Sequence, residues 1–366
     1  MFKKLFQKQK TEETEEIQMS KFISDKPALT YDDVLLVPQY SSIESRTQVD
    51  LSVPFEPGFN LAIPVVSSPM DTITGANMAA MMFRMGGLGI IHRYNTIEKQ
   101  AQLVESAMKK GGFLVGAAVG VTGDYLERTQ ELVAKGASAI CIDVAHGHHK
   151  LMKDAIDNIK SWAPDYLHIM AGNVATKEGY EALANWGADS VRCNVGGGSI
   201  CTTRIQTGHG VPGLHTIFEC AKSQFAGTTL IIADGGIRNS GDAVKALAAG
   251  ADLVMLGSLL SGTDETPGSV FEDEDGNLRK NFRGMASKEA QKDWRGKFSS
   301  LEGVATSVPC RGPVAEIIYE LEQGIRSGCS YTGATTLEDL RHKAQFIVQS
   351  ASSQKESNAH IYGRYS

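Results

Sequence analysis

The sequence RCNVGGGSICTTRIQTGHGVP, residues 192–212, ends a short apolar run and opens into a glycine-rich loop. The run, Ser190–Arg192, has the character of a short strand, and three consecutive glycines follow it at 196–198. Glycine permits close backbone approach and positive φ angles, so this composition suits a binding turn at a strand end. A run followed by such a loop is the unit that the rest of the chain repeats.

Short apolar runs recur from residue 63 onward, and each is followed by a longer amphipathic stretch. Their starts lie mostly about 22 to 28 residues apart, the length of one strand plus one helix. The runs are Ile63–Val66, Leu88–Ile91, Leu114–Val119, Ala139–Ile142, Leu167–Met170, Ser190–Arg192, Leu230–Ile232 and Leu253–Leu256. Eight such units predict a (β/α)₈ TIM barrel, with an open doubly wound sheet as the main alternative.

The regions outside the repeat predict an arm and a flap. Residues 1–28 have mixed charge and few large apolar residues, which predicts a flexible N-terminal arm, with a short surface helix as the alternative, before a single barrel domain at 29–366. Residues 261–309 follow the eighth run and are long, polar and rich in glycine, which predicts a mobile flap too irregular for the core. Helices are expected on either side of the last two runs, near 216–223 and at 314–327. Between His92 and Leu114 there is room for one helix only, so we expect no inserted regulatory domain there.

Composition excludes several classes of function. The formal net charge of −6 gives no electrostatic footprint for nucleic acid. The six cysteines are scattered without a Cys-x-x-Cys pair, which predicts reduced thiols in an intracellular protein. No apolar stretch is long enough to span a membrane, and the start lacks the apolar region of a secretory signal. We therefore expect a cytoplasmic protein that binds neither nucleic acid nor membrane.

Polar residues collect directly after the runs, where a barrel of this kind carries its chemistry. They are Ser67, Ser68 and Asp71 after the first run, His92 after the second, Asp143, His146 and His148 after the fourth, Asn173 after the fifth, Cys201 after the sixth, Asp234 after the seventh and Ser258 after the eighth. Because the carboxyl ends of all strands meet at one mouth, the sequence predicts a single active site there.

Cys201 is the candidate nucleophile. It lies on the polar glycine-flanked loop with Ser199 and Thr203 beside it and Arg204 three residues on. Positive charge and backbone N–H groups favour the thiolate, which is the reactive form of cysteine. A flexible loop with an incidental cysteine is the alternative, and the added hydroxyls and cation favour catalysis over it.

Glycine turns after the last two runs predict a phosphate site. Gly235 and Gly236 follow the seventh run and Gly257 the eighth, where barrels commonly bind phosphate through backbone N–H groups. Asp234 would repel a phosphate, so we assign it to ribose hydroxyls, with a solvated turn residue as the alternative. Asn173 offers both a donor and an acceptor to a purine edge or to a catalytic loop, and a structural turn is its alternative.

A flap carboxylate and a group of histidines complete the candidates. Glu302, next to Gly303, is predicted to relay protons together with Thr203, with an ordinary surface glutamate as the alternative. His146, His148 and His149 have no carboxylate cluster at ligand spacing, so we do not expect metal catalysis through them. No G-x-G-x-x-G motif follows a strand, so any dinucleotide is bound without a Rossmann unit.

Six motifs together resemble the family of IMP dehydrogenase and GMP reductase, from about Leu29 to the end of the chain. They are GGGSICTTR (196–204), SSPMDT (67–72), AGN (171–173), ADGGIR (233–238), MLGS (255–258) and FRGM (282–285). The resemblance implies a homotetramer that binds a purine nucleoside monophosphate, attacks C2 of the base through Cys201 with Thr203 and Glu302 assisting, and uses NADPH or NAD. It implies substrate contacts from Ser68, Met70, Asn173, Arg192, Ser199, Asp234, Gly235, Gly236, Gly257, Ser258, Phe282, Gly284 and Met285. It places the cofactor at Asp143, Val144, Ala145 and Gly196, and a potassium ion on the carbonyls of Gly196, Gly198 and Cys201.

The resemblance leaves two reactions open. The segment from Ser287 to Glu302 is short and lacks the Arg-Tyr pair that activates water in the dehydrogenase, although Arg295 is a potential substitute. This short flap, with SSIESRTQVDLS (41–52), RIQTG (204–208) and RSGCSYTGA (326–334), favours GMP reductase. SSPMDT, GTDETPG (262–268) and ESNAH (356–360) favour IMP dehydrogenase.

The glycine loop departs from both enzymes. Asn194 stands where the family usually has glycine, and Gly197 where it has proline, which weakens the potassium prediction. We favour the reductase with NADPH over the dehydrogenase with NAD. A nucleotide-binding barrel without activity is the remote third alternative, because Cys201, Thr203 and Glu302 are all present.

Overall fold

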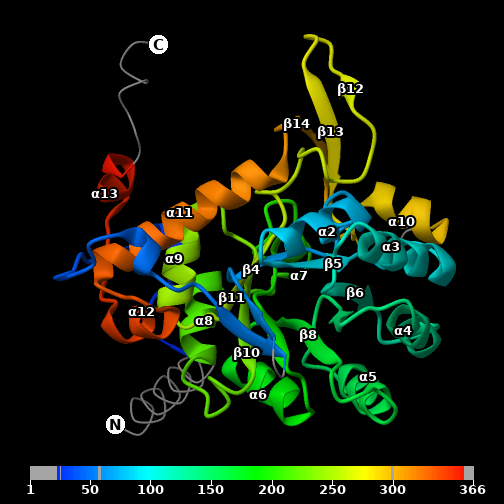
Figure 1. Ribbon diagram of the computed structural model, residues 1–366, viewed down its shortest axis with the longest axis horizontal. Helices are drawn as coiled ribbons and strands as arrows, with labels where there is room; N and C mark the ends of the chain where they lie inside the picture. Colours follow the sequence, from blue (N-terminus) through cyan, green and yellow to red (C-terminus); the bar gives the residue numbers. More distant parts are fainter. Residues whose placement is uncertain (1–22, 25, 57–58, 298–300, 358–366) are drawn as a thin grey trace, which may run out of the picture.

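Eight parallel strands close into a barrel in the computed structural model, which describes residues 23–24, 26–56, 59–297 and 301–357 (Figure 1). In hydrogen-bonded order the strands are β4 (Val65–Ser67), β5 (Leu88–Ile91), β6 (Val115–Val119), β7 (Ala139–Asp143), β8 (His168–Val174), β9 (Ser190–Cys193), β10 (Leu230–Asp234) and β11 (Leu253–Leu256), with β11 pairing back to β4. This confirms the TIM barrel and excludes the open sheet.

Most of the helices surround the barrel, where they return the chain from one strand to the start of the next. They are α2 (Ala76–Arg84), α3 (Ile97–Lys109), α4 (Tyr125–Ala134), α5 (Lys150–Lys160), α6 (Lys177–Asn185), α7 (Thr203–Thr207), α8 (Gly213–Cys220), α9 (Ser240–Ala248) and α11 (Val314–Thr332). In α5 the buried residues Met152, Ala155, Ile156 and Ile159 form one apolar stripe against the sheet. Between β5 and β6 the described chain has α3 alone, which confirms that no domain is inserted there.

Two helices differ in extent from the sequence interpretation. The helix expected at about residues 216–223 is α8, which starts at Gly213 directly after Pro212. The last barrel helix, expected at 314–327, continues as α11 to Thr332 and ends at Gly333 in the left-handed conformation. Gly328 lies inside α11 where the helix packs closely on α9. A Cβ atom at this position would lie 2.6 Å from Val244 Cγ2, so the contact favours glycine.

The predicted flap contains regular elements. An antiparallel sheet is formed by β12 (Phe271–Glu272), β13 (Leu278–Arg283) and β14 (Ala305–Pro309). Along the chain, α10 (Lys288–Arg295) comes between β13 and β14. Figure 1 shows the β12–β13 hairpin projecting away from the barrel. Lys280 fixes its base, because Nζ is buried and donates to the carbonyls of Thr263 at 2.9 Å and Thr266 at 2.7 Å. The segment lies outside the barrel sheet as expected, but it has regular structure of its own, and its mobility stays a prediction.

The chain ends and one hairpin lie outside the repeat. β1 (Val34–Leu36), after the 3₁₀ turn η1 (Tyr31–Asp33), pairs with β15 (Phe346–Val348) near the C-terminus. The remaining elements are η2 (Arg46–Gln48), β2 (Val53–Glu56), β3 (Phe59–Leu61), α12 (Leu337–Lys343) and α13 (Ala351–Glu356). Most of the predicted arm, 1–28, lies outside the described residues. Within the described part, no helix combines the length and apolar character needed to cross a membrane.

Candidate active site

A cavity of about 440 Å³ opens at the carboxyl ends of the barrel strands. Every residue that the sequence predicted for substrate, cofactor, potassium or catalysis lines it. These residues are Ser68, Met70, Asp143, Val144, Ala145, Asn173, Arg192, Gly196, Gly198, Ser199, Cys201, Thr203, Asp234, Gly235, Gly236, Gly257, Ser258, Phe282, Gly284, Met285 and Glu302. The fold thus brings them together, while the role of each stays a prediction.

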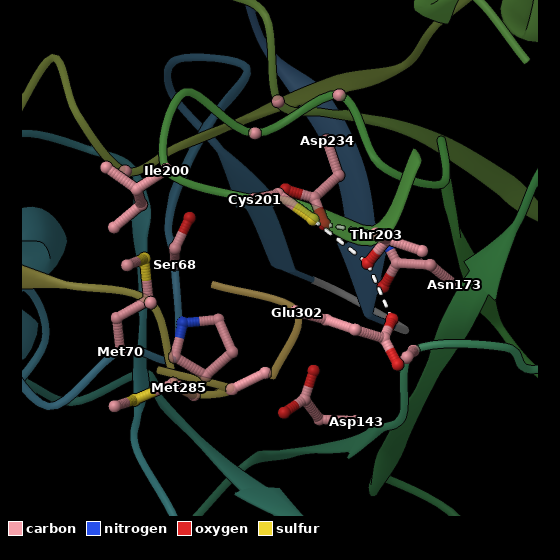
Figure 2. A pocket seen from close by; sticks show the side chains of 18 of the residues that line it. Ser68, Met70, Asp143, Asn173, Ile200, Cys201, Thr203, Asp234, Met285 and Glu302 are labelled. Carbon is pink, nitrogen blue, oxygen red and sulfur yellow. Dashed lines mark hydrogen bonds between the residues drawn. The ribbon is translucent and has the colours of Figure 1, made fainter. Parts of the chain in front are cut away.

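Cys201, Thr203 and Glu302 form a chain of polar contacts across the cavity (Figure 2). Cys201 is half-buried on the loop after β9, and its Sγ lies 3.2 Å from Thr203 Oγ1. The Thr203 hydroxyl donates to Glu302 Oε2 at 2.8 Å. With that donor engaged, Thr203 Oγ1 is left to accept from the thiol. The arrangement can carry a proton from Cys201 to Glu302.

Backbone pairing positions Glu302 by joining the flap to residues 194–212, the cysteine loop, which follows β9. Thr202 N donates to Glu302 O at 2.9 Å, and Val304 N donates to Ile200 O at 3.0 Å. An isolated antiparallel bridge joins Cys201 to Gly303. Main-chain contacts at Glu302, Gly303 and Val304 therefore hold the backbone that carries the carboxylate.

Arg192 on β9 joins two carboxylates at the strand ends. Its guanidinium lies 2.5 Å from Asp143 Oδ1 and 2.9 Å from Asp234 Oδ2. Burial alone would raise the pKa of Asp143, but Arg192 and then Arg93 outweigh it and hold that pKa below its ordinary value. Burial opposes the charge of Arg192 as well, and the nearby carboxylates, Asp234 above all, raise its pKa well above the usual range. Arg192 and Asp143 are therefore both charged at neutral pH.

Asn173 extends this network to a further strand. Its Nδ2 donates to Asp234 Oδ2 at 2.7 Å and to Asn194 O at 3.0 Å. Asn173 was expected to follow the strand that ends at Met170, but β8 continues to Val174 and contains it, so that part of the interpretation was wrong. Among the described residues, none donates a hydrogen bond to Asp234 Oδ1. That oxygen is available to accept from a ligand hydroxyl in the cavity.

Two glycines at the end of β10 form a turn that other residues cannot form without strain. Gly235 and Gly236 have φ angles of 91° and 80°. A Cβ atom on Gly235 would lie 3.2 Å from the backbone of Gly197, so the β10 turn and the cysteine loop are in close contact. Beside β11, a Cβ atom on Gly257 would lie 3.4 Å from Ser68 Oγ. These close backbone approaches shape the part of the cavity predicted to bind phosphate.

The loop after β4 and the segment after β13 form another wall of the cavity. Figure 2 shows Ser68, Met70 and Met285 together on one side of it. The Asp71 backbone N–H donates to Met285 Sδ at 3.2 Å, and Arg283 lies 2.6 Å from Asp71 Oδ2. These contacts fasten the FRGM segment of the flap to the SSPMDT segment of the barrel.

An aromatic and cationic cluster was missed by the sequence interpretation. The Arg93 guanidinium lies 5.0 Å from the Tyr94 ring centroid and 5.5 Å from that of Trp294, and all three line the cavity. Arg93 and Tyr94 directly follow β5, the same signal that selected His92. Trp294 gave no signal, because its place depends on how α10 packs. His92 itself is buried outside the cavity lining, and burial lowers its pKa to about 4.

The residues predicted to hold the cofactor, Asp143, Val144, Ala145 and Gly196, line the same cavity as Arg93. Arg93 Nε lies 3.6 Å from Asp143 Oδ2 and makes no hydrogen bond to the described residues, although it is buried. Its N–H is paired with Asp143 through charge alone, so it fits a ligand that brings a hydrogen-bond acceptor. No group of three or more His, Cys, Asp or Glu side chains among the described residues could hold a metal ion.

Comparisons with known proteins agree on one family. Residues 28–360 match the family model described as IMP dehydrogenase / GMP reductase domain. The inosine-5′-monophosphate dehydrogenase of Nitrosopumilus maritimus is 35% identical over 92% of this chain and 98% of its own length. The GMP reductase of Leishmania major is 32% identical over 91% of this chain and 96% of its own.

A solved structure that is similar to this chain also belongs to this family. It is the GMP reductase of Trypanosoma brucei, as a cysteine-to-alanine variant in complex with guanosine 5′-monophosphate. It superimposes with a TM-score of 0.86 and 30% identity, covering 92% of this chain and 98% of the other.

Proposed function

The chain belongs to the IMP dehydrogenase / GMP reductase family of NAD(P)-dependent oxidoreductases, and we propose that its own reaction is the reduction of GMP by NADPH to IMP and ammonia. The observation that carries this choice is the direct chain Cys201–Thr203–Glu302, closed by a flap whose described residues contain one short helix, α10. The reductase needs a proton relay to its leaving amine and no activated water. The short flap, without an Arg-Tyr pair, supplies that relay.

The first chemical step is attack by Cys201 on the base. Its sulfur forms a bond to C2 of guanine while the thiol proton passes through Thr203 to Glu302. The amino group then leaves with its bonding electron pair and takes the proton back along the same path, departing as ammonia. When bound, NADPH supplies the hydride that replaces the amino group at C2, and loss of the thiolate completes IMP.

The strand-end groups are proposed to hold the nucleotide during these steps. The close backbone turns at Gly235, Gly236 and Gly257, with Ser68 and Ser258 beside them, surround the 5′-phosphate. Asp234 Oδ1 accepts from a ribose hydroxyl, while its other oxygen is fixed by Arg192 and Asn173. GMP should therefore be a substrate and guanosine should not.

The assembly and the ion are proposed from the family resemblance. We infer a cytoplasmic homotetramer with one barrel domain at 29–366, and a potassium ion on the carbonyls of Gly196, Gly198 and Cys201. Cys201 N donates to Gly198 O at 3.1 Å, so a tight turn brings these residues together on one loop. Sedimentation of the purified protein tests the tetramer.

IMP dehydrogenase is the second candidate, favoured by its relatives. The IMP dehydrogenases of Nitrosopumilus maritimus and Borreliella burgdorferi are 35% and 36% identical, above the 32% of the Leishmania major reductase. This reaction needs a water activator, for which the sequence offers Arg295 at the end of α10, a side chain outside the described residues. Arg295→Ala would then reduce NAD in one burst and stall as an adduct on Cys201.

Paired absorbance assays of the purified protein test the proposal. We expect oxidation of NADPH with GMP and no reduction of NAD with IMP. Cys201→Ala should abolish turnover while retaining GMP binding, because binding rests on the glycine and serine groups. Arg295→Ala should stay within about tenfold of the parent in GMP reduction, a barrier change of at most about 1.4 kcal/mol. The burst and adduct with IMP, without NADPH oxidation by GMP, would overturn the reductase in favour of the dehydrogenase.

A further inference from the structure

Asn194, at the start of the cysteine loop, has an unusual backbone conformation. Its φ of 145° is the only positive value of a non-glycine residue in the described part of the chain. Its side chain is buried, with 4% of the residue exposed. A side chain in this region of φ persists only where its surroundings stabilise it.

The Asn194 side chain fills the space next to Gly197. A Cβ atom on Gly197 would lie 2.7 Å from Asn194 Cγ and closer still to Asn194 Nδ2. Both approaches are too short for any side chain at 197 while the amide of Asn194 is in place. The two positions therefore share one volume, and only one of them can carry a side chain there.

Further contacts tie this amide to the rest of the loop. Asn194 Oδ1 accepts from Arg204 Nη2 at 3.4 Å, and the same nitrogen donates to Val211 O at 2.7 Å and Val195 O at 3.2 Å. Asn194 N donates to Val174 O at 2.8 Å. Asn194 thus links strand β8 to both limbs of the cysteine loop.

We propose that Asn194 and Gly197 form an interlock: the Asn194 amide fills the space that a side chain at 197 would need, and it thereby positions the loop that carries Cys201. The two departures from the usual glycine and proline of the family are then one compensated change. Asn194 is a positioning residue, acting on Cys201 through the loop. The inference rests on the proposed function only in taking Cys201 as the reactive thiol.

A double-mutant cycle tests the interlock through Gly197→Ala, Asn194→Gly and their combination. Gly197→Ala alone overpacks the loop and should lower Tm by about 5 °C. In the Asn194→Gly background the same change should lower Tm by less than about 1 °C, because the space is vacated. An equal loss in both backgrounds would overturn the interlock. If Gly197→Ala alone does not fold, folding of the double variant supports it and failure of both contradicts it.

Gly208→Ala is the matched control. Gly208 lies on the same loop with a φ of 72°, and a Cβ atom there would meet nothing within 4 Å. Its cost comes from backbone conformation alone, so Asn194→Gly should not relieve it. Relief of Gly208→Ala by Asn194→Gly would show a general loosening of the loop instead of a shared volume, and would sink the interlock.

Alkylation of Cys201 separates positioning from stability. Asn194→Gly relieves the positive φ, so Tm should stay within about 2 °C of the parent. Loss of the amide should nevertheless expose the half-buried thiol and speed its reaction with iodoacetamide about threefold or more, measured on the Cys201 peptide by mass spectrometry. An unchanged rate would refute the positioning role. The readout needs no turnover, so it stands apart from any failure of the proposed reaction.

Discussion

The carboxylates at the strand ends and the carboxylate on the flap are held in different ways. Asp143 and Asp234 share the buried cation Arg192, and all three lie on strands of the barrel. Glu302 comes from a segment that reaches the barrel through backbone pairing and the hydroxyl of Thr203. The barrel itself fixes the first pair, whereas local docking fixes Glu302. Substitutions in the first region should therefore reduce stability, and substitutions in the second should reduce rate.

The largest effect is expected for Glu302→Gln. The amide keeps the shape but cannot take the proton from Thr203, so GMP reduction should fall by about 10² to 10⁴. Its Tm should stay close to that of the parent, because the backbone pairing remains. Steady-state kinetics and thermal melts measure the two quantities. Glu289→Gln on the exposed surface of α10 is the control, and equal slowing by both variants would remove Glu302 from the chemistry.

Arg192→Met should have the largest effect on stability. It leaves Asp143 and Asp234 buried without their shared cation, and breaking a buried charge network typically costs about 3 to 5 kcal/mol. Chemical denaturation measures the loss. Lys153→Met is the control, because it removes an exposed pair with Asp157 and should cost less than about 1 kcal/mol. Similar losses in the two variants would contradict the distinction between the regions.

The strand ends could be predicted from the sequence because local signals define them. Each apolar run ends where its polar residue appears, and parallel strands in a barrel bring those ends to one mouth. Asp143, Asp234 and Cys201 were found in this way. The same signal applied to Arg93 and Tyr94 after β5, and the choice of His92 there was less successful, because His92 is buried away from the cavity lining.

Contacts between distant segments could not be predicted. β1 and β15 pair across almost the whole chain, and neither short run shows its partner in its own sequence. The flap sheet was missed for the same reason, since β13 and β14 are polar and their pairing is decided by tertiary contacts. The sequence proposed a link between Glu302 and Thr203, but the backbone pairing that holds it appears only in the fold.

His92 gives a pH test of the barrel region. Its pKa is lowered by burial to about 4, so the unfolded chain takes up a proton near pH 6.5 while the folded one does not. Above that pH His92 contributes nothing, and as pH falls from about 6.5 to 4 it should cost about 3 kcal/mol of stability. His92→Leu should flatten this part of the curve of unfolding free energy against pH. An unchanged slope would assign the loss to other groups.

The smallest effect is expected for Asp293→Asn. This variant compares the barrel with the flap through Arg283, which pairs with one carboxylate from each. Arg283 lies 2.6 Å from Asp71 on the barrel and 2.6 Å from Asp293 on α10. The Asp71 side chain is 13% exposed and that of Asp293 is 67% exposed, so solvent screens the second pair far more.

Losing an exposed pair typically costs less than about 1 kcal/mol, so Asp293→Asn should lower the free energy of unfolding by less than that. The rate of GMP reduction should stay within about twofold of the parent. Asp71→Asn should cost more, because it removes the less exposed partner of the same arginine. Denaturation and kinetics of the two variants give the comparison. If Asp293→Asn slowed the reaction as much as Glu302→Gln, the flap would be docked through this ion pair, and the backbone pairing beside Cys201 would not be what positions Glu302.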